Sequence, residues 1–187
     1  MSTMHCSLLS LGCVFGFATP SDKHTLNALH AFKIAQRRLR PEVRSKLLSV
    51  SSSRMDGSLV PEAWRFAFLD QATSGNSRVV TVAAKTSSEH PDTIEAFSPS
   101  LGRTENEATH HPVAQSKWVV DSDQALALAR SASKLKGIHS AEYRLSQPRH
   151  AQEPLWTLYF YGEAPEAVVR FQIAAKSGAV KILTNGE

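Results

Sequence analysis

Hydrophobic and polar positions follow the same pattern twice along the chain. Residues 61–85 read PEAWRFAFLDQATSGNSRVVTVAAK, and residues 153–176 read EPLWTLYFYGEAPEAVVRFQIAAK. Each segment has an alternating run that begins at a tryptophan, then an acidic turn, then a Val-rich run that ends in Ala-Ala-Lys. Alternation with a period of two is typical of strands that are buried on one face. The pattern therefore predicts two hairpins related by internal duplication, with Trp64 equivalent to Trp156.

A helical pattern precedes each hairpin. At residues 21–39 apolar side chains recur every three or four positions, Ser21 offers an N-cap, and Pro41 is expected to end the helix. Asp121 offers the N-cap of a second helix, and Gly137 is placed as its C-terminal stop. The apolar positions are Ala28, Leu29, Phe32, Ala35 and Leu39 in the first helix, and Ala125, Leu128, Ala129, Ala132 and Leu135 in the second.

Further strands are predicted beside the hairpins. Residues 46–54 and 93–97 flank the first hairpin, and residues 139–145 and 179–183 flank the second. Residues 98–117 lack periodicity, so we expect an exposed linker there. We predict an α+β fold with two tandem units, each one helix packed on a roughly four-stranded antiparallel sheet. Whether the two sheets pack face to face or join edge to edge stays open.

Composition places the chain among globular proteins. Of its 187 residues, 42% are hydrophobic and 20% are charged, which is far from the composition of disordered chains. The net charge of +4 is mildly basic, and the lysines and arginines are spread along the chain. The densest positive charge is at Arg37, Arg38, Arg40 and Arg44. A solvated helix end is the simpler interpretation of this cluster, and a nucleic-acid site is the alternative.

The N-terminus has the pattern of an export signal. Residues 8–18, LLSLGCVFGFA, have the length of a signal-peptide core and are too short to span a bilayer. Small residues up to Ala18 suit a cleavage site, so residues 1–18 are predicted to be a signal peptide, although no Lys or Arg precedes the apolar run. The alternatives are lipidation at Cys13, and an apolar N-terminal strand or a disordered tail in place of a signal. Because Cys6 and Cys13 are the two cysteines of the chain, cleavage after Ala18 would leave none.

The sequence offers no catalytic, cofactor-binding or metal-binding residue that we assign. Among the eight histidines, His110 and His111 are adjacent, while His24 and His30 are six positions apart. Neither pair has the i, i+4 spacing of a helical zinc site. The chain has no G-x-S-x-G elbow and no glycine-rich phosphate loop. We therefore predict a protein that is not an enzyme and uses no cofactor, with a small histidine-dependent hydrolase as the enzymatic alternative.

The two equivalent tryptophans are interpreted as core residues. A tryptophan at the same place in each copy most simply anchors a strand to its helix. The alternative is an exposed aromatic platform at Trp64 and Trp156 for a peptide or a glycan. An exposed sheet edge would offer a second way to bind a partner, by addition of the partner's strand.

The C-terminal copy resembles the PepSY domain family. The resemblance rests on the strands WTLYF and VRFQIAAKSGAVKI, in which Lys176, Ser177 and Gly178 stand where the family has its turn before the last strand. The chain departs from the family at Ala174 and Ala175, where an acidic residue is usual, and the N-terminal copy is more divergent. The resemblance implies a small α+β unit, mostly found outside the cytoplasm, that binds or restrains a peptidase or another envelope partner.

Together these patterns predict an exported protein, periplasmic or secreted, with repeats at residues 21–97 and 118–187 joined by a linker at residues 98–117. Its predicted function is to bind a protein partner in the cell envelope, restraining or assisting a peptidase. Contact with the membrane is expected only if Cys13 is lipidated. The alternative function is that of a cytoplasmic basic protein that binds nucleic acid through the arginine cluster at residues 37–44.

Overall fold

A computed structural model gives the structure of the protein. It describes residues 26–55, 57–72, 76–85, 93–103, 110–133, 135–163 and 167–183. The predicted signal peptide at residues 1–18, its cleavage site at Ala18, the N-cap proposed at Ser21 and both cysteines lie outside the described residues.

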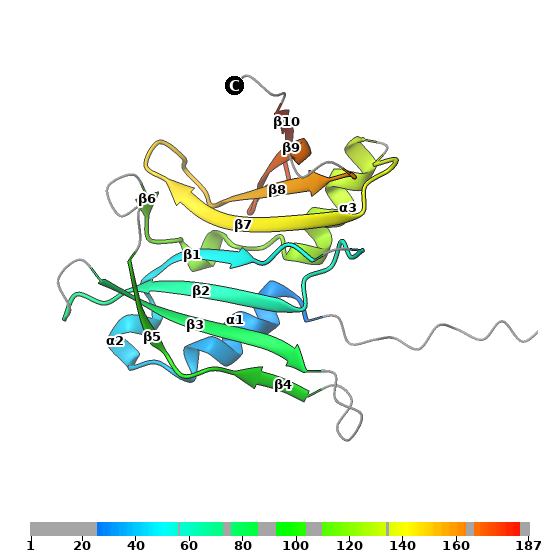
Figure 1. The fold of residues 1–187 in the computed structure, drawn as a ribbon. Coiled ribbons are helices and arrows are strands. Elements are labelled where there is room, and N and C mark those ends of the chain that lie inside the picture. Colours follow the sequence, from blue (N-terminus) through cyan, green and yellow to red (C-terminus); the bar gives the residue numbers. More distant parts are fainter. Residues whose placement is uncertain are drawn as a thin grey trace, which may run out of the picture.

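The strands form one antiparallel sheet with the order β10-β9-β8-β7-β1-β2-β3-β4 (Figure 1). Beside this order, β5 pairs with the first part of β3, and β6 pairs with the last residues of β7. The bounds are β1 Leu47–Ser52, β2 Ala63–Leu69, β3 Asn76–Lys85, β4 Thr93–Ala96, β5 Ser100–Arg103, β6 His110–His111, β7 Ser140–Pro148, β8 Leu155–Tyr161, β9 Ala167–Ala174 and β10 Val180–Leu183.

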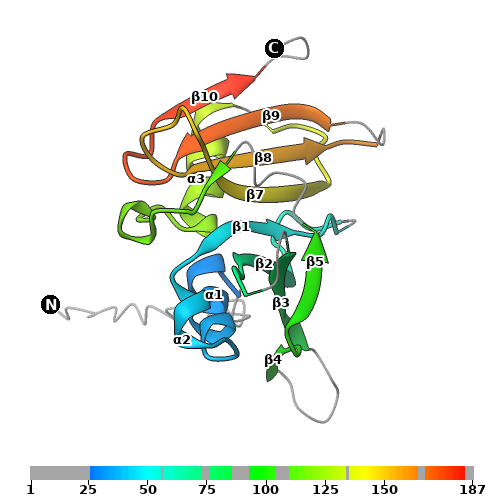
Figure 2. The same ribbon diagram turned by 90° about the vertical axis from the view of Figure 1, so that its left-hand side faces the viewer.

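The helices cover one face of this sheet (Figure 2). They are α1 Ala28–Gln36, α2 Pro41–Arg44 and α3 Ser122–Ala132, with a short 3-10 helix at Gln115–Lys117 before α3. The side chain of Asn27 caps α1 by accepting a hydrogen bond from the His30 amide. The α3 helix begins with a reciprocal capping box between Asp121 and Gln124.

The helix ends differ from the predicted ones. The α1 helix ends at Gln36, and Pro41 opens α2 instead of ending α1, because proline suits the first turn of a helix. The α3 helix ends at Ala132, so Gly137 lies in the turn that follows, with a φ of +69°. Leu126, which the predicted apolar stripe omitted, is buried, whereas Ala132 is exposed.

The predicted fold class is wrong for the molecule as a whole. We expected two units, each with a helix on its own four-stranded sheet, but β1 and β7 pair and join the strands into one large sheet with only short helices. Across this seam Val50 lies opposite Leu145, and Ser51 lies opposite Arg144. The pairing supplies hydrogen-bond partners for β1 and β7, which would otherwise expose unpaired main-chain groups as edge strands.

One hydrophobic core runs under both sides of the β1–β7 seam. The ring centroids of Trp64 and Trp156 lie 6.1 Å apart, and Tyr143 lies 5.8 Å from the first and 6.4 Å from the second. Trp118 then connects Trp156 to Phe32 of α1, with centroid distances of 5.9 and 5.3 Å. The two halves are therefore packed against each other through shared aromatic contacts.

Trp64 and Trp156 are completely buried, so their interpretation as core residues is confirmed. The Trp64 indole donates to the carbonyl of Leu26 at 2.6 Å, and the Trp156 indole donates to the carbonyl of Val120 at 2.8 Å. Each acceptor stands immediately before the N-cap residue of a helix, α1 or α3. The two tryptophans thus connect equivalent strands, β2 and β8, to equivalent helix starts.

The range expected to be a linker, residues 98–117, contains paired segments. It includes β5, β6 and the 3-10 helix, and Val113 within it is buried and donates its amide to the carbonyl of Leu47 at 2.6 Å. These strands have four residues and two residues. Segments of that length are too short to show an alternation that identifies a strand.

Candidate binding face of the sheet

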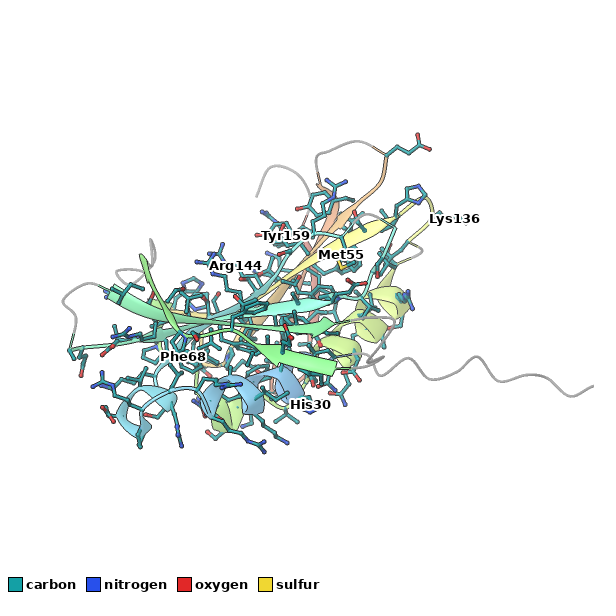
Figure 3. The ribbon with its side chains drawn as sticks, turned by 60° about the horizontal axis from the view of Figure 1, so that its bottom comes forward. His30, Met55, Phe68, Lys136, Arg144 and Tyr159 are labelled. Carbon is teal, nitrogen blue, oxygen red and sulfur yellow. The ribbon has the colours of Figure 1, made fainter. Side chains whose placement is uncertain are left out.

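The face of the sheet away from the helices carries polar side chains, and we call it the open face. Figure 3 shows Arg144 and Tyr159 on this side, whereas Phe68 lies on the side of the helices. The division follows from the alternation of the strands, because successive side chains point to opposite faces. In β2, for example, Trp64 and Phe66 are buried, while Arg65 between them is exposed.

The register of the strands aligns seven polar side chains of the open face in one row across the sheet, from β3 to β10. Each residue lies directly opposite the next one on the neighbouring strand. Because neighbouring strands lie about 4.8 Å apart, the row extends over about 29 Å. We call this set the polar row: Thr81, Arg65, Ser51, Arg144, Thr157, Gln172 and Lys181.

Two arginines lie at the centre of the polar row, on either side of the β1–β7 seam. Arg65 and Arg144 are both exposed, and Ser51 separates them. Their main chains are two strands, or about 10 Å, apart. Within the described residues neither guanidinium forms an ion pair. The row itself contains no acidic side chain. The two positive charges at its centre are therefore not neutralised by their neighbours in the row.

The acidic residue nearest to Arg144 along the chain is Glu142, on the open face of β7. Its carboxylate accepts a hydrogen bond from the Tyr161 hydroxyl at 3.1 Å. Burial, with a further contribution from the charge of Glu142, raises the pKa of Tyr161 to about 12, so its hydroxyl remains a donor at neutral pH. The guanidinium of Arg54 lies 4.4 Å from the centre of the same ring. Glu142 is therefore held by the Tyr161 hydroxyl.

A second polar site lies in the core, where the N-termini of α1 and α3 meet. The Asp121 carboxylate accepts hydrogen bonds from the amides of Ser122 at 2.6 Å and Leu29 at 3.1 Å. The Ser122 hydroxyl accepts a hydrogen bond from the Ala28 amide at 3.0 Å. Burial raises the pKa of Asp121, although these amide donors act in the opposite direction. The caps of α3 therefore also hold the first turn of α1.

A small pocket lies beside this helix junction. Its volume is about 110 Å³, and its lining includes Leu26, Val60, Trp64, Leu126 and Tyr143. Pockets for small ligands typically hold about 300–1,000 Å³. The pocket is therefore smaller than a typical small-molecule site.

The arginine cluster predicted at residues 37–44 is partly engaged within the protein. Arg40 forms ion pairs with Glu42 and with the buried carboxylate of Asp70, both at 3.2 Å. Arg44 donates from Nε to a main-chain carbonyl at 2.8 Å. A hydrogen bond from Arg78 is the main cause that lowers the pKa of Asp70. Two of the four clustered arginines thus make structural contacts, and the other two are exposed on the side of the helices.

The histidine pairs considered from the sequence are not brought together as a metal site by the described residues. His24 lies outside them, His30 is exposed on α1, and His111 is exposed on β6. Across the described ranges, no group of three or more His, Cys, Asp or Glu side chains is placed to hold a metal ion. The helices that the structure describes are too short and too polar to span a membrane.

The alternation predicted from Trp64 onward places Arg65 between apolar residues, but sequence reasoning missed the polar row. The members come from both copies, and their proximity depends on the β1–β7 pairing, which no local pattern indicates. The sequence signal for the row is the set of polar residues that alternate with apolar residues along each strand. Comparison of the chain with protein-family models, with curated proteins and with solved structures finds no match.

Proposed function

We propose that the protein is an exported, non-enzymatic module that binds a partner protein on the open face of its sheet. The observation that carries the proposal is the pair of exposed arginines at the centre of the polar row. Arg65 and Arg144 form no ion pair with another described residue. Surface arginines are frequent in protein interfaces because their planar guanidinium groups form several directed hydrogen bonds.

The dimensions of the open face favour a macromolecular partner over a small ligand. The polar row alone is about 29 Å long, and a stable protein interface buries about 800 Å² on each partner. A small molecule would instead need a concave site, and the pocket that described residues line at the helix junction holds only about 110 Å³.

The proposed location of the partner comes from the sequence. The signal peptide expected at residues 1–18 directs the search to the cell envelope, and the resemblance to the PepSY family directs it first to peptidases. Mass spectrometry of the N-terminus after cell fractionation tests the location. A chain that begins at Thr19 would support export, and an intact Met1 in the cytoplasm would contradict it.

Site-specific photo-crosslinking in cells tests the binding face. A photoreactive amino acid at Thr157 or Gln172 samples the polar row, and the same group at the exposed Arg38 samples the helix side. We expect a discrete protein adduct from the two open-face positions and none from position 38. Adducts only from position 38, or no adduct from the open face, would contradict the proposal. A nuclease-sensitive adduct at position 38 would instead favour the nucleic-acid alternative.

A further inference from the structure

We infer that the partner contributes an acidic protein segment, in which two carboxylates about 10 Å apart pair with Arg65 and Arg144 across Ser51. This inference rests on the proposed function, because it names the chemistry of the partner at the same face. It follows from the charges of the open face and from what lies between them.

The centre of the polar row is positively charged. Arg65 and Arg144 are like charges on one face of adjacent hairpins, and within the described residues no carboxylate pairs with either. Arginine is suited to carboxylates because its planar fork can bind both oxygens of one carboxylate. Two carboxylates from a partner would neutralise the two charges without any rearrangement of the sheet.

Hydroxyl side chains lie between and beside the two arginines. Ser51 lies between them, and Thr81 and Thr157 lie next to them on the outer sides. These hydroxyls donate and accept hydrogen bonds, so they match the main-chain and polar groups of a peptide. The centre of the row, from Thr81 to Thr157, therefore offers positive charge at two discrete places separated by neutral polar groups.

The charges of the open face suit an acidic protein better than a nucleic acid. The open face also carries two acidic residues. Glu142 of β7 is two residues from Arg144, and Glu95 of β4 lies opposite Ala83 of β3. A nucleic-acid backbone has a phosphate at every nucleotide and is bound by continuous positive charge. Acidic side chains on the same face would repel such a backbone, whereas a protein segment can place its carboxylates only where the arginines are.

The test measures the binding of defined probes to the mature chain at low salt by fluorescence anisotropy. The probes are a labelled ten-residue peptide of alternating Glu and Ser, the same peptide with Gln in place of Glu, and a ten-nucleotide thymidine strand. We expect the Glu peptide to bind, the Gln peptide not to bind, and the DNA to bind more weakly than the Glu peptide. Added salt should weaken the binding because both arginines are exposed.

Neutralising variants assign the binding to the two arginines. We expect Arg65→Gln and Arg144→Gln each to weaken Glu-peptide binding about threefold, and the double variant about tenfold, as exposed ion pairs would. The matched control is Arg37→Gln combined with Arg38→Gln, which removes the same charge from exposed positions on the helix side and should change binding less than twofold. A double Arg→Lys variant keeps the charge but loses the planar fork, and we expect an intermediate loss.

Unfolding midpoints equal to that of the unsubstituted chain ensure that these variants are folded. Equal losses in the open-face pair and in the helix-side control would overturn the inference, and so would tighter binding of the DNA strand. If the Glu peptide does not bind while Thr157 crosslinks a protein in cells, the acidic segment is wrong and the proposed function stands. If neither occurs, both are wrong.

Discussion

The three tryptophans differ in what their indole nitrogens donate to. Trp64 and Trp156 donate to main-chain carbonyls, whereas Trp118 has a buried Nε1 with no hydrogen-bond partner among the described residues. An unsatisfied buried carbonyl costs about 1–3 kcal/mol. The duplicated tryptophans should therefore contribute more to stability than Trp118, although all three are buried.

Trp→Phe substitutions test this difference. Each removes a similar volume, but only Trp64→Phe and Trp156→Phe remove a donor from a buried carbonyl. We expect these two to lower the free energy of unfolding by about 1–2 kcal/mol more than Trp118→Phe does. Urea unfolding measures all three. Equal losses for the three variants would show that volume, and not the hydrogen bond, determines the role of these residues.

At the scale of elements, Asp121 connects the N-termini of α1 and α3. Burial raises its pKa, so the folded protein binds a proton at pH values where the unfolded chain has already released it. Between the unfolded pKa of about 3.9 and the raised folded value, the folded state holds more protons, and the free energy of unfolding falls as pH rises.

Asp121→Asn removes this titration and keeps an oxygen that can accept from the amides of Leu29 and Ser122. We expect the stability of the unsubstituted protein, relative to this variant, to fall as pH rises from about 4 through the raised pKa. Urea unfolding at several pH values gives the difference. The opposite slope for Asp121 would mean that the amide donors at the helix N-termini lower its pKa by more than burial raises it.

Some helices and strands could be predicted from the sequence, and others could not. The alternation around Trp64 and Trp156 predicted β2 and β8, because a buried face repeats every second residue. The end of α1 was misplaced because a proline suits both the residue after a helix and the first turn of the next one. The strands β5 and β6 were missed because they are short and show no alternation.

The polar row depends on the pairing of strands that are distant in the chain, which local sequence patterns do not predict. Arg65 and Arg144 each stand between buried neighbours, so their outward direction follows from alternation alone. Their proximity requires β1 and β7 to pair, and these strands are distant in the chain. Edge strands carry unsatisfied main-chain groups whatever their side chains, so the sequence left open whether the two sheets would join.

For the whole molecule, one sheet over one core implies cooperative unfolding of both halves. Leu145 is fully buried, lies opposite Val50 across the seam, and lies opposite Trp156 on its other side. Removing its side chain would leave a cavity beneath both hairpins. Two independent units would instead confine the effect of such a cavity to the half that contains it.

Leu145→Ala tests this cooperativity, and we expect it to lower the free energy of unfolding by about 2–5 kcal/mol. Amide hydrogen exchange of Phe66 in β2 and Leu158 in β8 reports each half separately. Because Trp64, Tyr143 and Trp156 pack together across the seam, both amides should lose protection by the same free energy. Ile182→Ala, at a partly exposed position of the edge strand β10, is the control and should leave Phe66 protected. Loss of protection at Leu158 alone in the Leu145 variant would mean that β1 and β7 join two units that unfold independently.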